Sequence, residues 1–267
     1  HIFLGHRRLA ILDPTEQSNQ PFKSHDGRYI MVFNGEVYNF KSIKAELTDY
    51  PFTTTSDTEV VLAAYIKYGE NCLRMFNGMF AFAIWDTVDK KLFIARDRLG
   101  IKPLYYVLNN DEIIFSSSIK SILASNLVNR KISEEGLVDY LRYQTVHAPY
   151  TIIEGLFMLM PGQQITLSEE MEPKFKTYWN PTKDFYKASN SLSDVQDQVQ
   201  NKLSESVERR LVSDVPFGAF LSGGIDSSII VALMSEKHDQ KIDTFSVSFK
   251  EEEFSEAKYA KQVADLY

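Results

Sequence analysis

The sequence predicts a mixed protein whose first part is α+β and whose second part is α/β with a parallel sheet. Short apolar runs separated by turn residues recur between Gly78 and Ser117, which is typical of antiparallel strands. Further on, the apolar run Val215–Leu221 precedes two glycines and a helix-forming run, the order found in a parallel sheet. The polar segment 180–193 between these patterns contains Pro181 and has little periodicity, so we place a domain boundary there.

Composition favours a folded protein of one or two domains. The 267 residues are 44% hydrophobic and 13% aromatic, which is enough for a large core. A net charge of -7 without a basic cluster argues against a nucleic-acid partner, and no apolar run predicts a membrane span or a signal peptide. The single cysteine, Cys72, precludes an internal disulfide and fits a reducing compartment, so we expect a cytoplasmic location.

The two ends of the sequence indicate a portion of a longer protein. The first residue is His1 rather than methionine, and Glu256–Tyr267 is an amphipathic helix with no cap and no following strand. We therefore expect sequence to be missing on both sides.

The first elements are two predicted strands. Ile2–Leu12 is apolar apart from the segment 5–8, and arginines there are explained by solubility at an exposed sheet edge. Asp26-Gly27 is a hairpin turn signal, and Tyr29–Phe33 is a continuous apolar strand. Asn34-Gly35 follows, a pair that usually forms a turn.

The next elements are two predicted helices. Asn39 is a plausible N-cap for a helix with Phe40, Ile43 and Leu47 on one face, which places Asn34-Gly35 in a strand-to-helix connection. A second helix begins at Ser56-Asp57 and is closed by Gly69, and the helix dipole alone would explain Asp57. Cys72 follows without metal-ligand spacing, so we interpret it as a buried structural thiol.

Strands predominate in the remainder of the first part. Four strands form a predicted antiparallel meander. Two helical segments follow, and Pro161-Gly162 then opens a further strand pair. These strands span Gly78–Trp85, Lys91–Ala95, Leu104–Leu108 and Ile113–Ser117, then Gln163–Leu167 and Phe175–Trp179.

The second part opens with a long helix whose apolar stripe predicts a core face. The stripe consists of Val195, Val199, Leu203, Val207 and Leu211. Thr244–Phe249 is a second buried strand, whose end would lie beside the glycine turn in a parallel sheet.

The glycine turn at residues 220–228 has the chemistry of an anion site. Gly223 and Gly224 let the backbone approach a ligand, and the following helix offers free N–H groups and a positive dipole end. Asp226 beside bound phosphate would require a divalent cation, Mg²⁺ in our prediction. The glycine turn does not end in a Lys-Ser/Thr pair, which excludes the Walker P-loop. An ordinary glycine turn with a Ser or Asp cap would explain each residue singly.

The segment Ser222–Ser227 resembles the pyrophosphate loop, Ser-Gly-Gly-x-Asp-Ser, of the ATP pyrophosphatase superfamily, in which ATP is cleaved between the α and β phosphates. The resemblance implies that the chain holds the pyrophosphate and Mg²⁺ with Ser222, Gly223, Gly224, Asp226 and Ser227. Leu221 and Val247 would flank adenine.

A second resemblance is carried by five runs in the first part. They are Gly5–Ile11, Phe33–Asn39, Thr55–Glu59, Gly78–Ala83 and Arg96–Gly100. These runs resemble the class II glutamine amidotransferase domain of glutamine-hydrolysing asparagine synthetases, in which that domain precedes a Ser-Gly-Gly-Ile-Asp-Ser loop. The resemblance covers essentially the whole chain. It implies a four-layer α/β/β/α glutaminase domain of the N-terminal-nucleophile type over residues 1–180. The start of a parallel-sheet ATP pyrophosphatase domain would follow over 194–267.

The same resemblance implies a glutamine site. Asn34 and Gly35 would form the oxyanion hole. Arg8 would bind the α-carboxylate of glutamine, and Asp57 with Glu36 would bind its α-ammonium. The family's nucleophile is an N-terminal cysteine with its own α-amino group as base, which this sequence lacks and Cys72 cannot replace. We therefore expect no glutamine hydrolysis by these 267 residues alone.

The implied activity is ATP-dependent amidation of aspartate, through an aspartyl-adenylate and with release of AMP and pyrophosphate. Glutamine, ATP and aspartate would be substrates, ATP and Mg²⁺ the cofactors, and a homodimer is left open. The family's aspartate-binding residues lie beyond Tyr267, so two alternatives stand. One is a related amidotransferase acting on a sugar or peptide precursor. The other is a non-catalytic glutamine- or nucleotide-binding regulator of the same fold.

Overall fold

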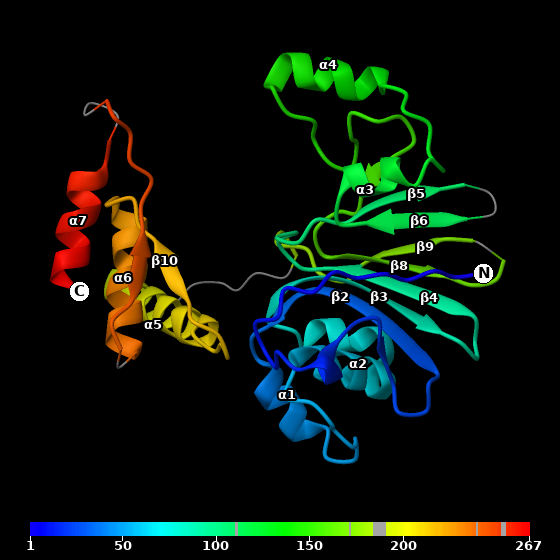
Figure 1. Ribbon diagram of the computed structural model, residues 1–267, viewed down its shortest axis with the longest axis horizontal. Helices are drawn as coiled ribbons and strands as arrows, with labels where there is room; N and C mark the ends of the chain where they lie inside the picture. Colours follow the sequence, from blue (N-terminus) through cyan, green and yellow to red (C-terminus); the bar gives the residue numbers. More distant parts are fainter. Residues whose placement is uncertain (110–111, 171, 184–190, 239, 252–254) are drawn as a thin grey trace. The chain divides into compact units, whose positions relative to one another are not determined.

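The computed structural model describes residues 1–109, 112–170, 172–183, 191–238, 240–251 and 255–267 (Figure 1). The chain divides into two compact units, His1–Phe185 and Tyr186–Tyr267. The predicted boundary segment 180–193 includes residues 184–190, which lie outside the described residues.

Two antiparallel sheets form the first unit. The larger has the order β1-β2-β3-β4-β8-β9 and the smaller the order β6-β5-β7. Their strands are β1 (Phe22–Lys23), β2 (Tyr29–Val37), β3 (Gly78–Asp86), β4 (Lys91–Arg96), β5 (Tyr105–Leu108), β6 (Ile113–Ser116), β7 (Phe157–Met158), β8 (Gln163–Leu167) and β9 (Lys174–Thr177).

Helices cover the outer faces of both sheets. They are α1 (Phe40–Glu46), α2 (Asp57–Tyr68), α3 (Ile119–Ala124) and α4 (Glu134–Tyr143), with short 3-10 turns η1 (Glu16–Ser18) and η2 (Gly69–Arg74). In Figure 1, α1 and α2 lie against the large sheet, while α3 and α4 lie beyond the small one. The order of layers is therefore α/β/β/α, as predicted.

The period of two along each strand divides the large sheet into two apolar faces. One face packs on the small sheet in a buried cluster of Val32, Ala81, Ala83, Leu92, Ile94, Leu104, Tyr106, Leu159, Ile165 and Leu167. The other face carries aromatic rings toward α2, where Tyr65 stacks on Phe93 with centroids 4.9 Å apart. Cys72 lies fully buried in η2, which confirms the structural interpretation of its position.

Several local predictions are confirmed in this unit. The turn at Asp26-Gly27 joins β1 to β2, with Gly27 at φ +71°. Ser56 caps α2 by accepting from the Thr58 N–H, and Gly69 closes that helix. Asn39 precedes α1, but its side chain does not cap the helix: it donates to the Met75 carbonyl and accepts from the Asn77 N–H.

The predicted strand Ile2–Leu12 is wrong. Residues 1–12 are all described and join no β-ladder, and Phe3 is 92% exposed. The large sheet ends at β1 on this side, and residues 1–12 do not extend it. Its Leu4 packs instead against the cluster between the sheets.

Two further predictions in the first unit require correction. The four-strand meander is in fact two hairpins in different sheets, β3–β4 and β5–β6. Asn34-Gly35 lies inside β2 rather than after it, because the pairing with β3 continues to Val37↔Gly78. The connection between the predicted strands Leu104–Leu108 and Ile113–Ser117 includes residues 110 and 111, which lie outside the described residues.

The second unit contains a parallel strand pair and three helices. Its elements are α5 (Leu192–Arg210), β10 (Gly218–Phe220), α6 (Ile225–Lys237), β11 (Asp243–Phe245) and α7 (Ala257–Leu266). β10 and β11 are parallel, and Ala219, Leu221 and Val231 belong to a small buried cluster. The strand order around the glycine turn is thus as predicted.

Burial in the second unit differs from the prediction. Phe220 is 84% exposed and Phe245 58%, so neither strand is buried on both faces. In the α5 stripe Val207 is buried, whereas Val199 is 51% exposed. Ala219 lies between the exposed residues Gly218 and Phe220 and is buried, so β10 alternates between exposed and buried residues. No described helix is long and apolar enough to cross a membrane.

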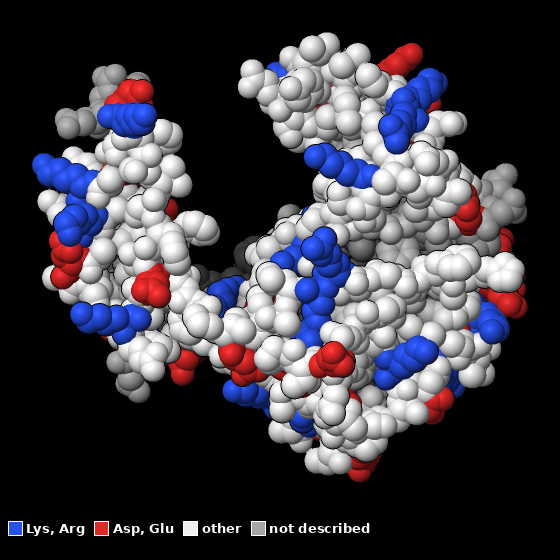
Figure 2. All heavy atoms as spheres, in the orientation of Figure 1, with Lys and Arg blue, Asp and Glu red and all other residues white. Residues whose placement is uncertain are grey.

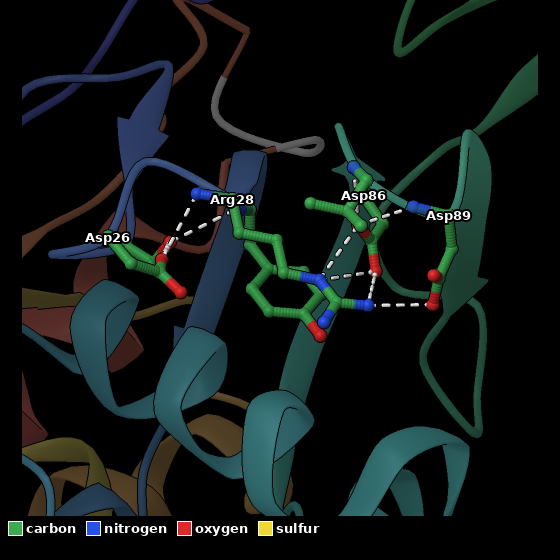
Figure 3. A network of polar contacts seen from close by, with 7 residues as sticks. Asp26, Arg28, Asp86 and Asp89 are labelled. Atoms are coloured by element: carbon green, nitrogen blue, oxygen red, sulfur yellow. Dashed lines mark hydrogen bonds and ion pairs between the residues drawn. The ribbon is translucent and has the colours of Figure 1, made fainter.

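Charge on the surface is mixed. Figure 2 shows Lys and Arg interspersed with Asp and Glu on the displayed face. One ionic group connects the start of β2 to the end of β3 (Figure 3). Arg28 donates from Nε and Nη2 to Asp86 at 2.7–3.0 Å, and from Nη2 to Asp89 at 2.6 Å. Asp26 accepts from the Arg28 N–H.

Replacing Asp86 with Asn should reduce the free energy of unfolding by about 1–3 kcal/mol at pH 7. Burial raises the pKa of Asp86, but hydrogen bonds from Arg28 and from the N–H groups of Asp89 and Val88 hold it at about 2. Because the unfolded value is about 4, this stabilisation is present above pH 4 and is lost as the pH falls through 2. Chemical denaturation between pH 2 and 7 should show the two proteins converging at low pH.

The control for this experiment is Asp49→Asn, at an exposed position. If Asp86→Asn were as stable as the parent at pH 7, the interaction with Arg28 would contribute nothing to the fold.

Candidate functional site

The centre of the candidate site is the second half of β2. Asn34 and Gly35 pair with Ala81 and Phe80 of β3. A Cβ on Gly35 would lie 2.1 Å from the Met79 carbonyl oxygen and 2.6 Å from the Phe80 Cα. Such distances are impossible for real atoms, so only glycine allows the strands to approach as they do.

Asp57 attaches the start of α2 to the end of β2. Its Oδ2 accepts from the Val37 N–H at 2.9 Å, next to Glu36 in the strand. The side chain is 4% exposed. Burial raises the pKa of Asp57 to about 6, although hydrogen bonds from Val37 and Thr58 and the charge of Arg8 act against it. If Asp57 only complemented the dipole of α2, it would need neither burial nor a contact with β2. The dipole alone therefore does not explain this residue.

Arg8 approaches the same region from the N-terminal segment. Its guanidinium donates to the carbonyls of Leu12 and Asp13, both at 2.6 Å, and of Thr15 at 3.1 Å. The positive charge lies close enough to Asp57 to favour its ionised form. The structure therefore brings Arg8 and Asp57 to one end of β2, where Asn34, Gly35 and Glu36 lie.

Asp13 is a site residue that our sequence analysis missed. It is buried, its Oδ2 accepts from the Thr55 N–H at 2.9 Å, and its Oδ1 accepts from the Thr15 hydroxyl at 2.5 Å. The loop that Arg8 holds is thereby fixed to the segment preceding α2. The turn pair Asp13-Pro14 was the available signal, because Asp before proline favours such turns.

His6 was also missed. Its imidazole donates to the carbonyl of Phe33, the residue before Asn34, and burial, then the charge of Arg8, lower its pKa. The His6 imidazole therefore lies beside β2, next to the residue that precedes Asn34. Cys72 is no part of it, since burial raises the pKa of its thiol and leaves it unreactive.

A second candidate site lies in the turn between β10 and α6. Gly223 has φ +83°, and a Cβ there would lie 2.5 Å from the Ala260 N, so α7 requires glycine at this position. Gly224 is the N-cap residue of α6. The hydroxyls of Ser222 and Ser227 are 3.0 Å apart, and Ser222 Oγ accepts from the Gly224 N–H. The predicted strand, glycine turn and helix are all present.

A cavity of about 730 Å³ opens where β10 and β11 end. It is lined by Phe220, Leu221, Ser222, Ser227, Phe245, Ser246, Val247, Phe249, Ser255, Glu256, Tyr259 and Ala260. A volume of this order suits a small-molecule ligand. Four predicted residues, Leu221, Ser222, Ser227 and Val247, are among the lining. The other predicted residues of the turn, Gly223, Gly224 and Asp226, do not line this cavity.

Asp226 lies exposed in the first turn of α6. No group of three or more His, Cys, Asp and Glu side chains gathers among the described residues. Mg²⁺ in nucleotide sites is commonly bound by one or two carboxylates together with substrate phosphates. Asp226 is a single exposed carboxylate in the first turn of a helix, which is the kind of group that such a shared site uses.

Family models match both parts of the chain. The model of the glutamine amidotransferase domain family matches residues 1–179, and the chain belongs to this family. A second family model, asparagine synthase, matches residues 198–267.

The particular relatives are longer proteins. Asparagine synthetase [glutamine-hydrolyzing] 1 of Bacillus subtilis (strain 168) is 41% identical over 267 residues, which is 99% of this chain and 41% of the relative. Amidase chry2 of Gibberella zeae is 37% identical over 240 residues, 88% of this chain and 35% of the relative. The chain thus spans well under half of both. A solved structure, glutamine phosphoribosylpyrophosphate amidotransferase from B. subtilis with ADP and GMP, aligns at 17% identity and TM-score 0.44, covering 92% of this chain and 52% of that one.

Asp57 generates a prediction about stability. Its folded pKa of about 6 is above the unfolded value of about 4, so the folded state binds this proton more tightly. The corresponding stability is present below pH 4 and is lost as the pH rises through 6. The parent should therefore lose about 1–3 kcal/mol relative to Asp57→Asn between pH 4 and 7.

Urea denaturation at half-unit pH steps measures this difference. Asp49→Asn, at an exposed position, is the matched control and should follow the parent. Parallel pH profiles for the parent and Asp57→Asn would show that Asp57 ionises normally.

Proposed function

We propose that the first unit supplies the glutamine-binding groups and the oxyanion hole of a glutaminase site, so that the full-length protein hydrolyses the side-chain amide of glutamine and delivers ammonia to a synthetase reaction. The observation that carries this proposal is the buried Asp57 carboxylate, tethered to β2 beside Asn34-Gly35 and close to the charge of Arg8. A carboxylate in such a place is costly unless a cation joins it. The α-ammonium of an amino acid is such a cation.

The other groups complete an amino-acid site. The positive charge of the Arg8 guanidinium suits the α-carboxylate. Nη2 donates both of its hydrogens to the loop carbonyls and Nη1 donates one, so the Nε–H and the second Nη1–H are left to donate to a ligand. Glu36, next to the Asp57 contact on β2, would share the ammonium. A zwitterion held at both charges extends its side chain in one direction, which we place toward Asn34 and Gly35.

The Asn34 amide and the Gly35 N–H would then stabilise the reaction. When a nucleophile adds to the side-chain amide of glutamine, negative charge develops on the carbonyl oxygen. Fixed N–H donors aimed at that oxygen lower the barrier without reorganisation. Breakdown of the adduct releases ammonia, and hydrolysis of the acyl group releases glutamate.

For the second unit we infer an ATP site. The free N–H groups at the start of α6 and the hydroxyls of Ser222 and Ser227 would bind the pyrophosphate, and the cavity between Leu221 and Val247 would take adenine. Mg²⁺, when bound by Asp226 and phosphate oxygens, would offset the repulsion between them. The match to the asparagine synthase family supports a reaction in which aspartate is adenylated and ammonia then displaces AMP.

Two other functions fit part of these observations. The first alternative, a glutamine-dependent amidotransferase acting on another carboxylate, fits the match to the glutamine amidotransferase domain family, because that domain supplies ammonia and does not bind the acceptor. The second, a non-catalytic regulator, would need the charged groups but no donors for a developing oxyanion. The close packing that fixes Gly35 argues against it.

The test of the glutamine site uses Arg8→Ala in the full-length protein. The glutamine requirement should rise by about tenfold or more, because a charge-assisted pair to the α-carboxylate is lost. Synthesis with free ammonia should stay at the parent rate. The matched control is Arg7→Ala, an exposed neighbour. A parent protein that releases no glutamate from glutamine would refute the function, and equal loss of both activities would make Arg8 purely structural.

The test of the ATP site uses Asp226→Asn in the same protein. Asn keeps the size and much of the capping ability, so stability should fall by less than about 1 kcal/mol. AMP and pyrophosphate formation should fall by about two orders of magnitude or more, while glutamine hydrolysis remains. The control is Asp243→Asn, an exposed carboxylate at the first residue of β11. AMP formation at the parent rate would exclude a metal role for Asp226, and ADP in place of AMP would exclude the pyrophosphatase chemistry.

A further inference from the structure

We propose that Asp97, supported by Arg96, is a positioning residue for the Asn34-Gly35 oxyanion hole and acts through Phe80. The run Arg96–Gly100 belongs to the glutamine amidotransferase resemblance, yet nothing in the function proposed above uses it. This inference rests on the proposed glutaminase site of the first unit.

The carboxylate of Asp97 is a hub for backbone N–H groups. Asp97 is fully buried. Its Oδ1 accepts from Leu99 at 3.1 Å and Ile101 at 2.9 Å, and its Oδ2 accepts from Lys102 at 2.9 Å and Phe80 at 3.2 Å. Four donors on one carboxylate hold a loop far more rigidly than one or two would.

Where β4 ends, Asp97 continues the hydrogen bonding to β3 through its side chain. The pairing of β3 with β4 ends at Ala81↔Arg96. The Asp97 N–H still donates to the Phe80 carbonyl at 2.7 Å, but the Asp97 carbonyl has turned away and accepts from Gly100 and Gly162. The side chain supplies the acceptor that the Phe80 N–H would otherwise lose. Both polar backbone groups of Phe80 therefore end on Asp97.

The position of the Phe80 backbone determines the position of Gly35 in the oxyanion hole. It lies opposite Gly35 in the β2–β3 register. Its Cα would be 2.6 Å from a Cβ on Gly35, so no side chain separates the two backbones and no space is left to absorb a shift. A displacement of Phe80 therefore moves the Gly35 N–H.

Arg96 secures the same loop through its carbonyl groups. The guanidinium donates to Lys102 at 2.7 Å, Gly100 at 2.6 Å and Leu159 at 2.5 Å, and Arg96 is 5% exposed. Leu99 is 71% exposed, so apolar burial does not hold the loop in place. Its conformation depends on the ionic side chains of Arg96 and Asp97.

The experiment compares glutamine hydrolysis by the full-length parent and Asp97→Asn. Asn places an NH₂ group against backbone donors, so the loop and Phe80 should shift. We expect kcat to fall by at least about tenfold, because small misplacements of catalytic groups are costly. The glutamine dissociation constant should stay within about threefold, and ammonia-dependent synthesis should be unchanged.

The matched control is Asp86→Asn, at the opposite end of β3. Asp86 is also buried and also accepts N–H groups, from Val88 and Asp89, so its variant tests general destabilisation of the same strand. It should keep the parent kcat. An Asp97→Asn kcat within threefold of the parent, or a fall no larger than that of Asp86→Asn, would overturn the proposal.

A second variant covers failure of Asp97→Asn to fold. Arg96→Gln releases the loop carbonyls while leaving the carboxylate in place, and the same criteria for kcat and glutamine affinity then decide. Loss of glutamine affinity with normal kcat would overturn the positioning role. Absence of glutamine hydrolysis in the parent would instead overturn the proposed function and this inference with it.

Discussion

β2 and β3 pair over nine residues, from Tyr29↔Asp86 to Val37↔Gly78, and at one end they approach so closely that both strands need glycine. A Cβ on Gly78 would lie 2.2 Å from the Glu36 carbonyl oxygen, which mirrors the constraint at Gly35. Since backbone rather than side chain fills this contact, the register cannot slip without a clash. The opposite end of the pairing is closed by Arg28 and Asp86. Every candidate group of the first unit is positioned relative to this pair of strands.

The candidate glutamine site is assembled from charges that the fold itself does not neutralise fully. Burial removes water from the Asp57 carboxylate, which accepts hydrogen bonds from Val37 and Ser56 instead. Burial raises the pKa of Asp57 by more than these hydrogen bonds lower it. Arg8 is held by backbone carbonyls instead of a carboxylate partner in direct contact. Such a site costs stability when empty, and a zwitterionic ligand would recover the cost on binding. This is the physical basis of our proposal that the ligand carries both charges.

Local patterns in the sequence predicted the local structure well. Turn chemistry at Asp26-Gly27 and capping at Ser56 depend on neighbouring residues only, and both are confirmed. The run Ile2–Leu12 failed because its apolar pattern says nothing about whether a partner strand exists. The assignment of strands to two sheets failed for the same reason, since alternation does not identify the partner. Three donors to the Asp97 carboxylate are local, but the Phe80 N–H comes from a residue 17 positions away, so no local pattern could reveal the link from Asp97 to β3.

The central claim is that one end of β2 binds the zwitterion and the side-chain amide of glutamine together. A crystal structure of the protein with bound glutamine tests it most directly. The account predicts the α-ammonium within hydrogen-bond distance of the Asp57 carboxylate and the side-chain carbonyl oxygen accepting from the Gly35 N–H. Glutamine bound with its α-ammonium away from Asp57, or this end of β2 empty at saturating glutamine, would contradict it.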